Sequence, residues 1–203
     1  QLMKPPSTKK ELFQKLGEIV QHGTYVMPEV RYKGAGAPGI FLQDLLGIRA
    51  DNKDIPDNVG FEIKFYTLKT NLITLFHKEP KPDNVVYSMV QRFGWKDKNG
   101  CLSFRHTIAG KSDRFQIFND ANQIIVRRID GNGIVPFWTH DEIVAAAGAK
   151  LRRLILVRGT RTKQEVTFQR VDCYENFQLN DFIWEIVHGV IKIDFDARES
   201  KPG

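Results

Sequence analysis

The chain has 203 residues, of which 41% are hydrophobic and 27% are charged. This length suits a single domain or two lobes, and the composition excludes collagen-like, low-complexity and disordered chains. The net charge of +6 is compatible with a nucleic-acid partner but is too small to identify one. Two cysteines, Cys101 and Cys173, exclude a disulfide scaffold and a Cys-rich zinc site. No apolar run approaches the ~20 residues that span a bilayer and no signal peptide is visible, so we expect a cytoplasmic protein.

Helix signals come first along the chain. Thr8 and Glu11 match a capping box, and apolar residues at helical spacing follow as far as Gly23, which predicts a helix between these positions. A short second helix is predicted to begin at Pro38 and to end at Gly47.

Most of the remaining chain favours strands. An Asn99-Gly100 pair predicts a hairpin turn, and Thr139 with Glu142 predicts a capped helix that continues through Ala147. The order of elements predicts a mixed α/β (α+β) fold with a substantial antiparallel sheet. Strands are expected at 60–66, 72–76, 85–93, 101–108, 114–118, 123–128, 151–157, 165–174 and 190–195, with a last helix at 180–188.

A glycine-rich loop formally matches the dinucleotide-binding pattern G-x-G-x-x-G through Gly34, Gly36 and Gly39. Such a site needs a preceding buried strand, a long following helix and a second strand that ends in an acid. The flanking segments are instead short, charged or polar. The pattern therefore favours a flexible hinge.

A sharper pattern combines Asp57, in a Pro-Asp turn, with Glu62 and Lys64 on the next predicted strand. Side chains two residues apart in a strand share a face, so Glu62 and Lys64 are expected to point the same way, and Gly60 permits a bulge between the two acids. Two carboxylates suit a hard ion such as Mg²⁺, which activates water and stabilises charge on phosphate, while a lysine orients the water or contacts the phosphate. A bare Glu-x-Lys pattern is also typical of a solvated strand face, so more than this motif is needed.

The neighbouring segments resemble successive signatures of the MvaI/BcnI type of restriction endonuclease, which is related to the mismatch-repair nicking enzyme MutH within the PD-(D/E)xK nuclease superfamily. The close resemblance covers about residues 36–80, and the remainder agrees in the order of elements. The matching segments are residues 39–48, 56–57, 60–64 and 72–80, with a weaker similarity at 189–195.

The resemblance implies a restriction-endonuclease-like fold, in which helices flank a mixed sheet and two lobes surround a DNA cleft. It implies that Asp57 and Glu62 bind Mg²⁺, with Mn²⁺ as a substitute, and that Lys64 is the catalytic lysine. It further implies a monomeric type II enzyme that cleaves double-stranded DNA at a short CC-N-GG-like site, one strand at a time, alongside a cognate DNA methyltransferase in a prokaryotic cell. We expect one nuclease domain over residues 1–203, mainly catalytic over about 1–130 and mainly DNA-recognising over about 131–203.

One position departs from the family pattern. The short helix carries Gln43 where these families usually have Glu, and Gln supplies a hydrogen bond to metal-bound water but no charge. Asp44 would point about 100° away around the helix. We include Gln43 among the catalytic candidates, and this departure leaves two alternatives open: a MutH-like strand-nicking repair enzyme and a catalytically weak DNA-binding module.

Candidate DNA contacts are basic residues near the predicted site or on a flexible tip between two strands. Such a tip suits a DNA groove, where Arg pairs with guanine, although an ordinary solvated hairpin has the same composition. The candidates are His77, Lys78, Arg152, Arg153, Arg158, Arg161 and Lys163.

Overall fold

The computed structural model describes residues 4–48, 58–69, 72–131 and 133–199. The chain forms two compact units. Unit 1 comprises Gln1–Phe76 and Gly148–Phe177, and unit 2 comprises His77–Ala147 and Gln178–Gly203. These bounds differ from the lobes expected at 1–130 and 131–203, because each unit is assembled from two separate stretches of chain. No helix within the described ranges is long and apolar enough to cross a membrane.

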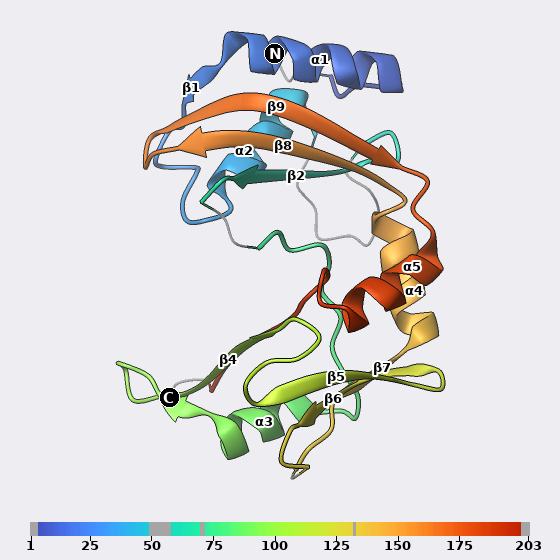
Figure 1. Cartoon of the computed structure of the whole chain (residues 1–203). Helices are drawn as coiled ribbons and strands as arrows, with labels where there is room; N and C mark the ends of the chain where they lie inside the picture. Colours follow the sequence, from blue (N-terminus) through green and yellow to red (C-terminus); the bar gives the residue numbers. More distant parts are fainter. Residues whose placement is uncertain (1–3, 49–57, 70–71, 132, 200–203) are drawn as a thin grey trace. The chain divides into compact units, whose positions relative to one another are not determined.

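Unit 1 is built on a four-stranded sheet in the order β1-β9-β8-β2 (Figure 1). β8 pairs with β9 antiparallel and with β2 parallel, and β1 adds to β9 antiparallel. The sheet is therefore mixed, as expected. Its strands are β1 (Thr24–Val26), β2 (Glu62–Thr67), β8 (Arg153–Arg161) and β9 (Glu165–Glu175).

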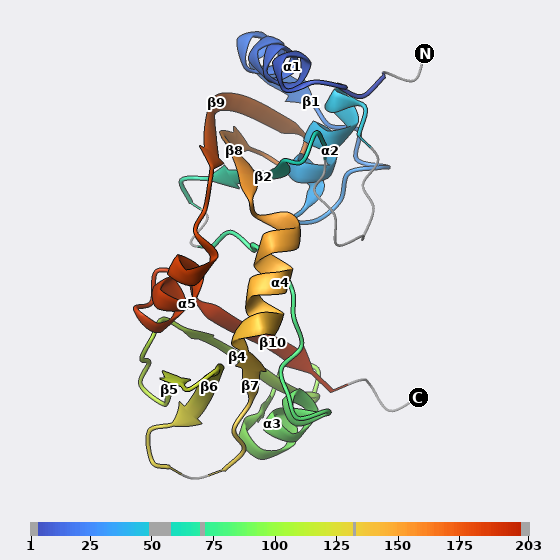
Figure 2. The ribbon, with the colours of Figure 1, turned by 90° about the vertical axis from the view of Figure 1, so that its right-hand side faces the viewer.

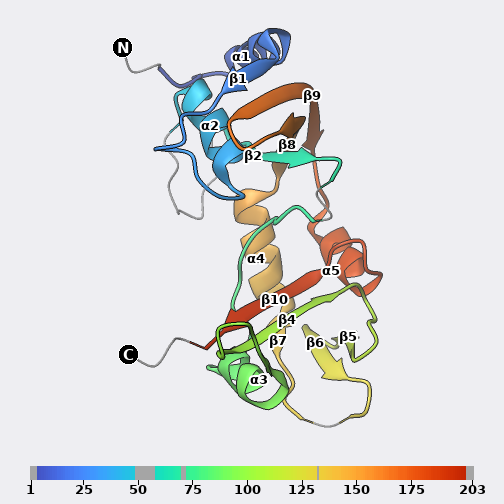
Figure 3. The same ribbon diagram turned by 90° about the vertical axis from the view of Figure 1, so that its left-hand side faces the viewer.

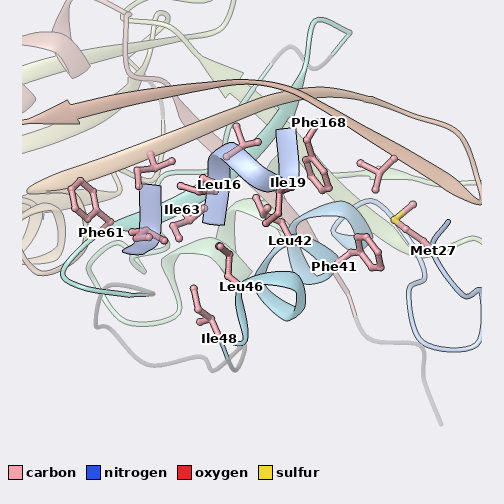
Figure 4. Packing of buried hydrophobic residues seen from close by; sticks show 14 residues of the cluster. Leu16, Ile19, Met27, Phe41, Leu42, Leu46, Ile48, Phe61, Ile63 and Phe168 are labelled. Carbon is pink, nitrogen blue, oxygen red and sulfur yellow. The ribbon is translucent and has the colours of Figure 1, made fainter. Parts of the chain in front are cut away.

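Helices α1 (Lys9–His22) and α2 (Ala37–Leu46) pack into one hydrophobic core with this sheet (Figure 4). The strands contribute alternate residues to the core, because successive side chains in a strand point to opposite faces. Glu62 and Lys64 therefore belong to the face opposite the core. The core residues labelled in Figure 4 are Leu16, Ile19, Met27, Phe41, Leu42, Leu46, Ile48, Phe61, Ile63 and Phe168.

The predicted signals begin and end these two helices, with one difference at α1: the Glu11 carboxylate accepts a hydrogen bond of 2.7 Å from the amide of Ser7, one residue before the capping residue. The Thr8 hydroxyl accepts a hydrogen bond of 3.2 Å from the Glu11 amide, which caps α1. α1 ends at Gly23 and α2 at Gly47, where φ is 82° and 76°, a conformation that glycine adopts without steric cost. Pro38 lies in the first turn of α2, as expected.

Unit 2 contains two three-stranded sheets, with the orders β10-β4-β3 and β5-β6-β7 (Figure 2). Helix α3 lies beside β4 (Figure 3), and rings from β4, β5 and β10 pack around Phe104. Thr139 and Glu142 exchange hydrogen bonds of 3.2 and 3.0 Å, so the second capping box is confirmed at the start of α4. The elements are α3 (Val85–Phe93), β3 (Trp95–Lys96), β4 (Leu102–Ile108), β5 (Phe115–Asp120), β6 (Gln123–Arg128), β7 (Phe137–Thr139), α4 (His140–Lys150), α5 (Leu179–Val187) and β10 (Ile193–Arg198).

Two segments that were predicted to be strands are not strands in the structure. Residues 85–93 form helix α3, because Val85, Met89 and Val90 recur at helical spacing and bury one face of it. The valines had favoured a strand, and tertiary packing overrides that preference. Residues 72–76 have no regular secondary structure and no strand partner, although their apolar alternation is typical of a strand.

Candidate active site

The site centres on two side chains of β2. Glu62 and Lys64 lie on the same face of the strand, and Lys64 Nζ is 2.7 Å from Glu62 Oε1. The Glu62 side chain is only 4% exposed, and that of Lys64 is 25% exposed. The predicted common face of this pair is confirmed. A buried carboxylate is costly unless a cation or hydrogen-bond donors compensate it, and Lys64 supplies the cation.

A tight turn precedes Glu62. Asn58 and Phe61 exchange backbone hydrogen bonds of 3.1 and 2.8 Å across Val59 and Gly60. Both central residues have positive φ, 50° for Val59 and 76° for Gly60, as in the two-residue turns of hairpins. The bulge expected at Gly60 is therefore a turn. Val59 is β-branched and has no intrinsic preference for this conformation, so the surrounding structure must hold it there.

Arg153 of β8 provides such support from the core face of the sheet. Its Nη1 donates a hydrogen bond of 3.2 Å to the carbonyl oxygen of Val59, and its guanidinium lies 4.0 Å from the centre of the Phe61 ring. Glu175 of β9 accepts from Arg153 at 2.7 Å and from Lys9 of α1 at 2.6 Å. Sequence reasoning missed Lys9 and Glu175, because only the pairing of Arg153 with Glu175 across β8 and β9 brings them to this turn.

The other acidic or amide candidates lie before β2 in sequence. Gln43 is half-buried on α2, which contacts β2. Asp44, the next residue, accepts hydrogen bonds from Arg31 at 2.9 Å and from the Tyr32 hydroxyl at 2.7 Å. The Asp44 carboxylate is therefore held by the loop that precedes α2. Asp57 lies outside the described residues.

The basic candidates at the hairpin tip contact other parts of unit 1. Arg161 donates hydrogen bonds of 3.1 and 3.0 Å to the carbonyl oxygens of Gly34 and Ala35, and Lys163 is 3.2 Å from Glu29. The tip is thus attached to the glycine-rich loop.

The remaining candidates differ in their surroundings. Arg152 is exposed just before β8, and Arg158 lies within β8 on the Glu62 face. His77 and Lys78 belong to unit 2, where His77 is 2.8 Å from Glu79 and the Lys78 carbonyl accepts from Trp138 at 2.9 Å.

A mixed sheet with helices on one face and a buried Glu-x-Lys pair on the other is typical of the PD-(D/E)xK class of nucleases. The sequence profile of the MvaI/BcnI restriction endonuclease family matches residues 13–203, and the chain belongs to this family. It is therefore a site-specific deoxyribonuclease. A comparison with curated proteins finds no match.

Two solved structures share the fold. A complex of restriction endonuclease MvaI with its cognate DNA substrate superimposes with a TM-score of 0.80 at 22% identity, over 92% of this chain and 83% of that chain. MvaI in the absence of DNA superimposes with a TM-score of 0.51 at 21% identity, over 96% of this chain and 85% of that chain.

Proposed function

We propose that this protein is a type II restriction endonuclease that hydrolyses phosphodiester bonds of double-stranded DNA at a short CC-N-GG-like site with Mg²⁺. It acts as a monomer on one strand at a time. The observation that carries the proposal is the buried Glu62 carboxylate with Lys64 at 2.7 Å on the face of β2 opposite the hydrophobic core. A purely structural ion pair on a solvated strand face would leave the carboxylate exposed to water.

The donor set fits a hard divalent ion in part. Glu62 offers a buried oxygen ligand, which Mg²⁺ prefers, although the described part of the chain holds no group of three acidic, His or Cys side chains. Asp57 would be the second ligand. It directly precedes Asn58 in the sequence and lies outside the described residues. Mn²⁺ would substitute because it accepts the same oxygen ligands.

The protein's own residues then have distinct roles. A bound Mg²⁺ would activate water and stabilise negative charge on the phosphate. Glu62 and Asp57 would hold the ion, and Gln43 would accept or donate a hydrogen bond to water near it. The Lys64 ammonium, oriented by Glu62, would contact the scissile phosphate or the attacking water.

DNA binding by the candidate basic residues rests on the same proposal. Arg152, Arg158 and the Arg161–Lys163 tip belong to the unit that carries Glu62, whereas His77 and Lys78 belong to unit 2. Arg153 is the candidate that the structure favours least as a DNA contact, because its guanidinium is engaged by Glu175 on the core side. In a prokaryotic cell a cognate methyltransferase would protect the host's own sites.

Plasmid DNA incubated with the full chain and Mg²⁺, with EDTA or no metal as controls, tests the function. Discrete fragments whose mapped ends share one short sequence are expected. Nicks that require hemimethylated sites and a partner protein would instead indicate the repair role. Binding without cleavage under every metal condition would overturn the proposal.

A further inference from the structure

Arg158 occupies a particular position on the face of the sheet that carries Glu62. In the pairing of β2 with β8, Lys64 lies opposite Leu156 and Tyr66 lies opposite Arg158. In the pairing of β8 with β9, Arg158 lies opposite Arg170. Residues paired in this way point to the same side of a sheet. Arg158 and Arg170 therefore extend the face that begins with Glu62 and Lys64.

One polar atom of Arg158 lacks a partner among the described residues. Its Nε is buried, and no described residue accepts a hydrogen bond from it. Arg170 has its own partner, Asp172, at 2.7 Å, and this carboxylate raises the pKa of Arg170 through a hydrogen bond and through its charge. Arg170 is charged at every working pH because a guanidinium does not lose its proton in proteins, and Asp172 offsets part of this charge. Tyr66 and Tyr174 are close enough to affect the pKa of Arg170 as well.

This arrangement is unfavourable for the protein alone. Like charges directly opposite each other on neighbouring strands are destabilising, and a buried guanidinium N–H without an acceptor loses the hydrogen bond that water would provide. An anion between the two arginines removes both penalties. Guanidinium groups bind phosphate oxygens through two parallel hydrogen bonds, so phosphate is a suitable anion.

We propose that Arg158 and Arg170 form a phosphate-binding site for the DNA backbone, next to the site of cleavage at Glu62 and Lys64. The inference rests on the proposed function and identifies one contact between the protein and its DNA substrate. Arg158 lies two residues beyond the position paired with Lys64, about 7 Å along the strand, and a long side chain spans the rest. The phosphate adjacent to the scissile one is therefore within reach.

Metal-free DNA binding by Arg158→Met tests the site, with Arg158→Lys and Arg170→Met as companions. The probe is a short labelled duplex of mixed sequence in EDTA over a series of salt concentrations. Arg158→Met should weaken binding about 10-fold and reduce the salt slope by about 0.9, because one phosphate contact is lost. Arg158→Lys should retain the salt slope and lose only part of the affinity.

The matched control is Lys10→Met, which removes one positive charge from exposed α1, a helix that packs on the opposite face of the sheet. It should leave both affinity and salt slope unchanged. Urea unfolding separates a binding role from a structural one. Arg158→Met should be as stable as the wild type or more stable, because it removes a buried N–H group that no described residue accepts from, whereas a structural role predicts lower stability.

Once the cut position is mapped, neutral methylphosphonate linkages placed one at a time locate the contact. One linkage beside the cut should weaken the wild type as much as Arg158→Met does, and should have no further effect on that variant. An unchanged salt slope for Arg158→Met, or additive losses at every linkage, would refute the phosphate site. Absence of cleavage by the wild type would instead refute the proposed function.

Discussion

Arg153 donates a hydrogen bond to the carbonyl oxygen of Val59, three residues before Glu62, although the two residues are 94 positions apart in sequence. The contact joins the strained turn at Val59 to the centre of the sheet. Glu175 orients the arginine, and the Phe61 ring lies against its guanidinium. The position of the carboxylate on β2 thus depends on a side chain from the opposite face of the sheet.

Replacement of Arg153 tests this dependence. Arg153→Met should lower the free energy of unfolding by about 2 kcal/mol, since a charged hydrogen bond and a cation–π contact are lost together. It should also slow cleavage, with Arg153→Lys intermediate. Urea unfolding and plasmid cleavage measure the two effects. The neighbouring Arg152→Met is the control for stability. If Arg153 acts mainly by contacting DNA, the salt slope of binding will fall and stability will not.

The Glu62–Lys64 pair predicts a non-additive change in stability. Lys64→Met should cost about 3 kcal/mol in EDTA, because it leaves a buried carboxylate without its cation, and Glu62→Gln added to it should restore most of that loss. Each single variant should also reduce cleavage at least about 100-fold. Urea unfolding of the wild type, both single variants and the double variant gives a double-mutant cycle for the pair. Additive losses of stability would show that the two side chains do not interact.

The amide at position 43 can be converted to the acid that the family usually has. We expect Gln43→Glu to lower the Mg²⁺ concentration for half-maximal cleavage several-fold, because a further carboxylate increases affinity for a hard cation. Asp44→Asn is the matched control on the same helix, since Asp44 is engaged by Arg31 and Tyr32. Magnesium titrations of cleavage measure both variants. If Gln43→Glu needs the same Mg²⁺ concentration as the wild type, residue 43 does not contact the metal ion or the water bound to it.

Glu142 predicts a pH dependence of stability. Its hydrogen bond with Lys81 and its capping contacts with Thr139 lower its pKa from 4.5 to about 2. A carboxylate with a lowered pKa stabilises the folded state above the unfolded pKa, near 4.5, and this contribution is lost as the pH falls towards 2. The free energy of unfolding of the wild type should therefore be higher than that of Glu142→Gln by about 1 kcal/mol at pH 7. The difference should become progressively smaller below pH 4.5.

Urea unfolding of both proteins from pH 7 to pH 3 measures this difference. Glu18→Gln, at an exposed position of α1, is the control and should follow the wild type. If the difference in the free energy of unfolding stays constant with pH, the negative charge of Glu142 does not contribute to stability.

Local signals in the sequence were sufficient where local interactions decide the structure. The capping residues Thr8 and Thr139, the terminal glycines of α1 and α2 and the common face of Glu62 and Lys64 all involve residues a few positions apart. They were therefore predictable.

Features that depend on tertiary pairing were not predictable in this way. Residues 85–93 carry apolar residues at helical spacing but also valines that suit a strand, and packing against β4 decides between the two. Arg158 meets Arg170 only through the pairing of β8 with β9. The contact of Arg153 with Val59 likewise requires the sheet order. Assignment of Glu62 and Lys64 to chemistry required resemblance to a family, because a Glu-x-Lys pattern alone does not separate an ion pair from a nuclease site.

The strand order β1-β9-β8-β2 has a consequence for how the enzyme can be divided. β1 and β2 occur early in the chain, but within the described sheet each pairs only with a strand from Gly148–Phe177 and not with the other. A fragment that ends before residue 148 would hold Glu62 on a strand with no neighbour in its sheet. Unit 1 is therefore kept together only if residues 77–147 are removed from within the chain and the two ends are joined, whereas residues 178–203 can be cut from the C-terminal side without loss of any of its strands.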